Sequence, residues 1–291
     1  MEKKDIIKLV AALLLGALCV GAVGYTVYKS LSRQRASDYQ KEAREQVVLL
    51  GDTVSPTPTM KPSPTPKEKP EEQTPEVSPT PELTPTPEPT KSADVPKTVS
   101  SGYDLTQIMK VNRDIIGWIR VPGTEIDYPL LQSGANNKYI DTAYDGKTKT
   151  DFGSIFTNNV IETNVDGEQN LIIYGHNMRA AGYGMFTSLM QYKSADYRKA
   201  HPKLELYFPD GVRTYRLFAV YNITTKDSFR FDKMAFGGKA DFEQYLAEVQ
   251  KRSIYESGIT ANAGSRLVTL TTCDRDYNQS DGRFIVVFIA N

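Results

Sequence analysis

The sequence predicts a mainly β fold, a mainly antiparallel β-barrel with helices added at its edges, in the C-terminal part of a chain of 291 residues. Two observations lead to this prediction. At least seven short stretches after residue 101 are rich in β-branched and aromatic residues and are bounded by turn residues, as β-strands are. These stretches do not alternate with helices in the manner of the βαβ units of a parallel sheet. A barrel lets such strands close on one another without leaving an exposed edge.

The expected elements follow one another from residue 104 to residue 290. The strands are expected at 115–121, 125–131, 170–174, 204–208, 214–222, 266–272 and 284–290. Helices are expected at 104–112, 185–200 and 239–252. The last helix carries apolar residues at helical spacing on one face, namely Phe242, Tyr245, Leu246 and Val249.

The N-terminal part is expected to hold the chain at the cell membrane as a single-pass protein. Residues 1–8 form a short cytoplasmic N-terminus, and the uncharged residues 9–28 are long enough to cross a bilayer as one transmembrane helix. Residues 29–55 are a juxtamembrane segment on the outer side. A cleavable signal peptide is the alternative, because residues 22–24 are small, but its apolar region would be unusually long.

Residues 56–100 are expected to be a proline-rich linker. Thirteen of the seventeen prolines lie between Pro56 and Pro96, in Ser-Pro-Thr-Pro and Thr-Pro-Glu-Pro style repeats. Such a stretch cannot bury a core and favours polyproline II. At about 3.1 Å per residue its reach is at most on the order of 130 Å. We therefore expect a spacer between the anchor and a folded domain at residues 101–291, the alternative being a tail that binds proline-recognising modules.

Charge and cysteine content limit the function classes. Lys and Arg number 35 and so do Asp and Glu, so the charge balance does not indicate a nucleic-acid partner. Cys19 lies in the apolar run and Cys273 is alone in the folded part, which can therefore form neither an internal disulfide nor a cysteine zinc cluster. No metal and no cofactor are expected. Taken alone, such a thiol is more often a small buried hydrophobe than a reactive group.

Three side chains at the ends of predicted strands form the candidate site. Cys273 ends one strand, and Arg283 opens the next strand after a polar loop. Neighbouring strands joined by such a loop run antiparallel, so the thiol and the guanidinium should share one rim of the sheet. His176 follows the end of an earlier strand and is the candidate base for the thiol. His201, the other histidine, precedes a proline and is expected to have a capping or packing role.

Several motifs, in this order and spacing, resemble the sortase family and class B sortases in particular. The first is Thr269-Leu270-Thr271-Thr272-Cys273, followed by Arg283. The others are Asn112-Arg113-Asp114-Ile115-Ile116-Gly117-Trp118-Ile119, Gly153-Ser154-Ile155-Phe156 and Tyr174-Gly175-His176-Asn177-Met178. The resemblance extends over about 103–291. It implies an eight-stranded sortase-type β-barrel and a membrane-bound enzyme whose catalytic domain, 101–291, is extracellular and faces the cell wall.

The resemblance also implies a cysteine transpeptidase. Cys273 would attack a peptide carbonyl to form a thioacyl intermediate, His176 would transfer protons, and Arg283 would hold the carbonyl or the oxyanion. The donor would be a surface protein with a C-terminal sorting signal of the Asn-Pro-x-Thr-Asn type, cut after Thr. The acceptor would be an amine of peptidoglycan or of its lipid-linked precursor. Asp274, next to the cysteine, is expected to be a loop-capping carboxylate.

Three alternatives remain. A pilin-polymerising sortase would use a lysine amine as acceptor, and nothing in the sequence distinguishes it from a wall-anchoring enzyme. A papain-like cysteine protease would hydrolyse the thioacyl intermediate rather than transfer the acyl group to an amine. In such proteases, however, the cysteine precedes the histidine in the chain, which is the reverse of the order here. A non-enzymatic surface module with a buried Cys273 would make the strand-end placement of the three side chains a coincidence.

Overall fold

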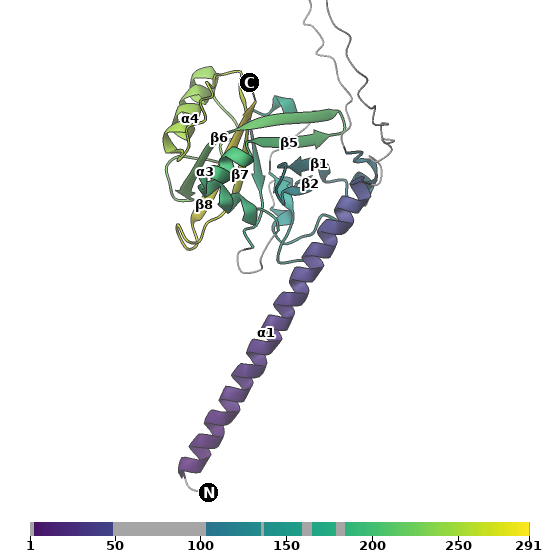
Figure 1. The fold of residues 1–291 in the computed structure, drawn as a ribbon, viewed down its shortest axis with the longest axis vertical. Coiled ribbons are helices and arrows are strands. Elements are labelled where there is room, and N and C mark those ends of the chain that lie inside the picture. Colours follow the sequence, from purple (N-terminus) through teal and green to yellow (C-terminus); the bar gives the residue numbers. More distant parts are fainter. Residues whose placement is uncertain (1–2, 49–102, 135–136, 159–164, 179–183, 291) are drawn as a thin grey trace, which may run out of the picture.

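Eight strands form a closed β-barrel in the C-terminal part of the molecule (Figure 1). The structure, a computed structural model, describes residues 3–48, 103–134, 137–158, 165–178 and 184–290. Around the barrel the strands follow the order β1-β2-β3-β4-β7-β8-β6-β5, so the predicted mainly β barrel is confirmed. The strands are β1 (Ile115–Arg120), β2 (Asp127–Gln132), β3 (Ile155–Thr157), β4 (Asn170–Tyr174), β5 (Lys203–Phe208), β6 (Gly211–Thr224), β7 (Arg266–Cys273) and β8 (Gly282–Ala290).

The strands expected from residue patterns all form; β4 has the expected bounds and the ends of the others are shifted by up to three residues. The eighth, β3, has only three residues and all of them are buried, so neither its length nor an alternation marks it in the sequence. Most neighbouring strands pair antiparallel as expected, but β2 pairs with β3, and β4 with β7, in parallel. The β4–β7 pair joins strands that are far apart in the sequence, and two parallel strands end at the same rim of the barrel.

Three hydrophobic clusters make up the buried core. The first fills the barrel and includes Leu130, Leu270 and Val286. The second lies between strands of the barrel wall and α4 (Lys239–Arg252), whose four expected apolar residues are all buried. The third joins β1 and β2 to α2 (Thr106–Val111) around the fully buried Trp118. Helices α4 and α2 therefore each cover an apolar part of the outer surface of the barrel.

The prediction of a single helix at 185–200 is wrong, because two separate helices form there. The structure has a 3-10 helix, η5 (Thr187–Lys193), and then a separate α-helix, α3 (Ala195–Ala200). Ser194 lies between them with an extended backbone, and its side chain accepts a hydrogen bond from the Tyr197 N–H as the N-cap of α3. A capping serine in this conformation begins a new helix rather than continuing the old one.

The first helix, α1 (Lys3–Val48), packs on the barrel by its C-terminal part and projects away from it by its N-terminal part (Figure 1). Ala43 and Val47 are buried in the same cluster as α2 and Trp118. The Arg44 guanidinium donates a hydrogen bond to the main-chain carbonyl of Asp127 at 3.2 Å. Part of α1 thus belongs to the folded core.

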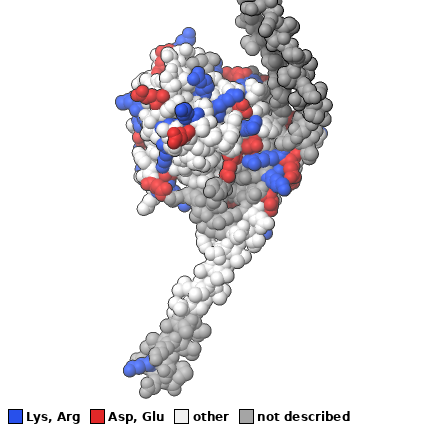
Figure 2. Space-filling view, viewed as in Figure 1, with Lys and Arg blue, Asp and Glu red and all other residues white. Residues whose placement is uncertain are grey.

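The anchor predicted at 9–28 lies inside α1. Residues 14–28 are uncharged, and this projecting part of the helix shows no blue or red in Figure 2. Within the described part of the chain, however, no helix is long and apolar enough to cross a membrane, so the structure does not support the predicted anchor. The proline-rich linker predicted at 56–100 lies outside the described residues. On either side of the range 49–102, Val47 and Tyr103 pack in one hydrophobic cluster.

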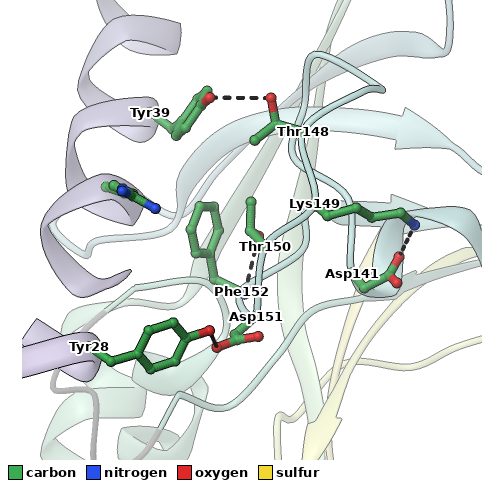
Figure 3. A pocket seen from close by; sticks show the side chains of 9 residues that line it. Tyr28, Tyr39, Asp141, Thr148, Lys149, Thr150, Asp151 and Phe152 are labelled. Carbon is green, nitrogen blue, oxygen red and sulfur yellow. Dashed lines mark hydrogen bonds and ion pairs between the residues drawn. The ribbon is translucent and has the colours of Figure 1, made fainter. Parts of the chain in front are cut away.

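A polar cavity of about 610 Å³ lies between α1 and the loop at 141–152 (Figure 3). The Tyr39 hydroxyl donates to Thr148 Oγ1 at 3.2 Å, and the Tyr28 hydroxyl donates to the Asp151 carboxylate at 3.3 Å. These contacts tie α1 to the loop that follows the short 3-10 turn η2 (Lys138–Ile140). The same turn contributes to the site described next.

Candidate active site

The thiol and the guanidinium lie opposite each other across the β7–β8 pair. Cys273 is the last residue of β7, and its register partner is Arg283 near the start of β8. The loop between them closes through the Asp274 N–H, which donates to the Gly282 carbonyl at 3.0 Å. A Cβ on Gly282 would lie 2.1 Å from the Asp274 carbonyl oxygen, so this close approach requires glycine. The shared rim predicted from the polar loop is confirmed.

His176 reaches the same rim because β4 and β7 run parallel. In the register of that pair, the position two residues beyond Tyr174 is level with Cys273. The chain is held there by Asn177, whose side-chain amide donates to the Cys273 carbonyl at 2.9 Å. Parallel pairing thus brings together two residues that are almost one hundred positions apart.

The three side chains line one cavity of about 220 Å³. All three are partly exposed, so a substrate can reach them. Phe156 and Tyr174 also line it and stack with their ring centroids 5.4 Å apart. Burial raises the pKa of Tyr174 to about 12. The cavity therefore combines an apolar wall with a thiol, an imidazole and a guanidinium.

Backbone carbonyls orient the Arg283 side chain. Its Nη1 donates to the Ser280 carbonyl at 3.2 Å and to the Gly282 carbonyl at 2.9 Å. A guanidinium has five N–H donors in a rigid plane, so these bonds leave further donors for a ligand in the cavity. The group is suited to hold a carbonyl oxygen or an oxyanion there.

The imidazole of His176 is held by a main-chain carbonyl of η2. Its Nε2 lies 2.6 Å from the carbonyl oxygen of Ile140. A carbonyl only accepts hydrogen bonds, so Nε2 is the nitrogen that donates, and Nδ1 is left for proton transfer. Neither the Ile140 carbonyl nor the Asn177 amide was identified from the sequence. Asn177 could have been noticed, because it directly follows His176 in one of the motifs. The Ile140 carbonyl could not, because every residue has a main-chain carbonyl.

Asp274 is a structural carboxylate, as expected. It is almost completely buried, accepts hydrogen bonds from Lys193 and Asn222 at 2.7 Å each, and caps the N–H of Asp276. Burial alone would raise its pKa, but the hydrogen bonds from Lys193 and Asn222 outweigh this, and the pKa lies below the ordinary value. The carboxylate holds the loop that separates Cys273 from β8.

His201 has the structural role expected of it. Its Nδ1 lies 3.0 Å from the Pro122 carbonyl oxygen, and its ring contacts Tyr197 with centroids 4.3 Å apart. It is not among the residues that line the cavity with the thiol. Of the two histidines, only His176 is near Cys273.

A thiol, an imidazole and a guanidinium that line one cavity at the rim of a closed barrel are the groups that cysteine-dependent acyl transfer can use. The chain belongs to the sortase family, since the family model described as the Sortase domain matches residues 119–288. It is 37% identical over 185 residues to Sortase B of Listeria monocytogenes, which covers 63% of this chain and 72% of that protein. It is 31% identical over 179 residues to Sortase B of Staphylococcus aureus, covering 61% and 70% respectively.

Solved class B sortases have the same fold. Sortase B of Clostridium perfringens is 32% identical with a TM-score of 0.57, and the match covers 64% of this chain and 99% of that one. A Staphylococcus aureus sortase B–substrate complex is 29% identical with a TM-score of 0.57, covering 64% and 84%. Sortases are cysteine transpeptidases, and these relatives and solved structures are class B sortases.

Proposed function

We propose that this chain cleaves a C-terminal sorting signal of the Asn-Pro-x-Thr-Asn type after Thr and joins the new carboxyl end to an amine of the cell wall. The observation that carries the proposal is the rim cavity, where Cys273 faces Arg283 across β7–β8 and His176 lies two residues beyond the end of the parallel neighbour β4. The sorting signal and the acceptor are inferred from the family.

The proposed reaction has two acyl transfers. The Cys273 thiolate attacks the Thr carbonyl carbon, the peptide C–N bond breaks, and His176 gives a proton to the leaving amine. The acceptor amine then attacks the thioester carbon, the C–S bond breaks, and His176 takes the proton from the attacking nitrogen. Arg283 stabilises the negative charge on the carbonyl oxygen in both steps.

The partners follow from this reaction. The donors are surface proteins with the sorting signal, and the acceptor is an amine of peptidoglycan or of its lipid-linked precursor. A polymerising sortase that uses a pilin lysine remains the second candidate within the family. A hydrolysing protease is a less suitable interpretation, because the relatives are transpeptidases.

The test is an incubation of the full chain with sorting-signal peptides, with and without an amine, followed by mass spectrometry. We expect cleavage after Thr and an amide product that requires the added amine. Free acid as the only product at saturating amine would support a protease instead. Lysine-containing pilin peptides accepted in preference to wall-type amines would support the polymerising enzyme.

We also propose that the enzyme works at the cell envelope with its barrel on the outer side. The support is the family and the uncharged stretch at 9–28. Mass spectrometry of membrane fractions tests it, since an uncleaved anchor predicts a chain that retains the residues before Tyr25. A soluble mature form that starts near Tyr25 would indicate a cleaved signal peptide.

A further inference from the structure

The η2 turn that holds His176 is itself fastened by side chains from the segment before β1. Asp114 accepts hydrogen bonds from the Lys138 ammonium at 2.8 Å and from the Tyr139 hydroxyl. The Asn112 side-chain amide donates to the same hydroxyl at 2.8 Å. Tyr139 is fully buried, so its hydroxyl cannot exchange these partners for water. We call these four residues, Asn112, Asp114, Lys138 and Tyr139, the turn network.

The opposite side of the turn rests on the backbone before β3. The Ser154 N–H donates to the Tyr139 carbonyl at 2.9 Å. A Cβ on Gly153 would lie 2.5 Å from the Ile140 carbonyl oxygen, and the φ of Gly153 is +56°. Only glycine leaves room for the carbonyl at this place and adopts this backbone conformation without strain. Two motifs that no catalytic role explains, around Asn112 and around Gly153, therefore converge on one turn.

Ile140 is the residue of the η2 turn that lines the cavity. Its carbonyl accepts a hydrogen bond from His176 Nε2, and this bond is the link between the turn and proton transfer. We propose that the turn network is a positioning device for His176, which fixes the Ile140 carbonyl so that Nε2 donates to it and Nδ1 serves the reaction. The inference rests on the proposed catalytic role of His176. The four residues of the network do not line the cavity, so they are positioning residues.

The physical reason for such a device is the sensitivity of proton transfer to distance. Proton transfer by a placed side chain contributes about 10² to 10⁴ in rate, and a displacement of about 1 Å can remove about a hundredfold. A partly exposed imidazole on a loop has several rotamers, and one hydrogen bond that it donates to a rigid acceptor selects among them. Without the Tyr139 hydroxyl, Asn112 and Asp114 lose a buried partner, and the turn can shift.

The experiment uses the full chain, labelled with ¹⁵N in its histidine rings. The chain has only two histidines, so the ring signals of His176 can be compared with those of His201 in the same sample. Their hydrogen bonds involve different nitrogens, Nε2 for His176 and Nδ1 for His201, so opposite neutral tautomers are expected. The variants are Tyr139→Phe and Asp114→Asn.

Tyr144→Phe is the matched control. Tyr144 is buried in the same cluster as Tyr139, but no hydrogen bond of its hydroxyl occurs among the described residues. We expect Tyr139→Phe and Asp114→Asn to change the His176 ring signals, to leave those of His201 unchanged, and to lower kcat about tenfold to a hundredfold. Tyr144→Phe should keep both spectra and a kcat within about twofold of the parent.

The outcomes separate this inference from the proposed function. Unchanged His176 signals in both network variants would overturn the inference, and so would changed signals with an unchanged kcat. If Tyr139→Phe also alters the His201 signals, its fold has changed and Asp114→Asn decides. The ring spectra are recorded without substrate, so a parent chain that cleaves no sorting peptide would refute the proposed function alone.

Discussion

The docking of α1 on the barrel predicts that a chain beginning at residue 101 is less stable than one that retains the helix. Ala43 and Val47 are 1% and 0% exposed, and they cover the outer face of β1 and β2 together with α2. Removing α1 would expose this apolar surface to water and would also remove the hydrogen bond from Arg44 to the Asp127 carbonyl.

The size of the effect follows from the buried side chains. Burial of a valine contributes about 1.5–3 kcal/mol and that of an alanine methyl about 0.8 kcal/mol. We therefore expect the loss of Val47 and Ala43 to lower the free energy of unfolding by about 2 to 4 kcal/mol. For a domain of this size such a change lowers Tm by about 4 to 16 °C.

Differential scanning fluorimetry on four variants and the parent chain measures the effect. A deletion of residues 56–96 retains α1 and should keep the parent Tm, whereas a chain beginning at residue 101 should melt earlier. Val47→Ala should account for about 1 to 3 kcal/mol of the loss. Val27→Ala, the same change at a position that is 52% exposed, is the control and should have little effect. Equal Tm values for the truncated chain and the parent would refute the docking.

Four further predictions concern the site. Cys273→Ala removes the only thiol among residues 101–291 and should abolish thioacyl formation, seen as the absence of a covalent intermediate by mass spectrometry. His176→Ala should lower kcat by about 10² to 10⁴, whereas His201→Ala should retain activity if the fold survives; the reverse pattern would refute the assignment. Arg283→Lys keeps the charge but loses the planar arrangement of N–H donors and should lower kcat about a hundredfold. The double variant Arg283→Lys with His176→Ala should have a kcat only slightly below that of the less active single variant. The pKa of Asp274 is lower in the folded state than its ordinary value of 3.8. The ionised carboxylate therefore stabilises the fold at pH values above 3.8, and this stabilisation is lost as the pH falls through the folded-state pKa. The Tm of an Asp274→Asn chain should therefore decrease less on acidification than the Tm of the parent.

Most of the barrel could be predicted from the sequence because its strands carry their own signals. The strand at 170–174 and the helix at 239–252 form with the expected bounds, since turn residues and apolar spacing mark both. The three-residue β3 has no such signal, because all its residues are buried and the barrel decides where it pairs. Ser194 could be identified as a helix breaker only from its backbone conformation, since serine also occurs inside helices.

The site shows the same division between local and tertiary information. The proximity of Cys273 and Arg283 follows from one loop between neighbouring strands, so the sequence was sufficient to predict it. The place of His176 depends on the parallel pairing of β4 and β7, which no local pattern indicates. His176 was chosen as the candidate base because it follows a strand end and the folded part holds a lone cysteine and an arginine at strand ends too, and the family resemblance agrees with that choice. The Ile140 carbonyl could not be found in either way, because any residue carries one.

The packing of α1 on the barrel also bears on the spacer role predicted for the proline-rich stretch at 56–100. A spacer at 56–100 would set the distance between the barrel and the membrane only if the chain before it were free of the barrel. Instead, Val47 before the stretch and Tyr103 after it pack in one cluster, and Tyr28 and Tyr39 bond to the loop beside the barrel. From Tyr28 back to residue 9, a helix rises about 1.5 Å per residue and covers roughly 30 Å. The distance from the cavity that holds Cys273 to the N-terminal part of α1 is therefore set by the length of this helix. The extended length of the proline repeats does not affect this distance.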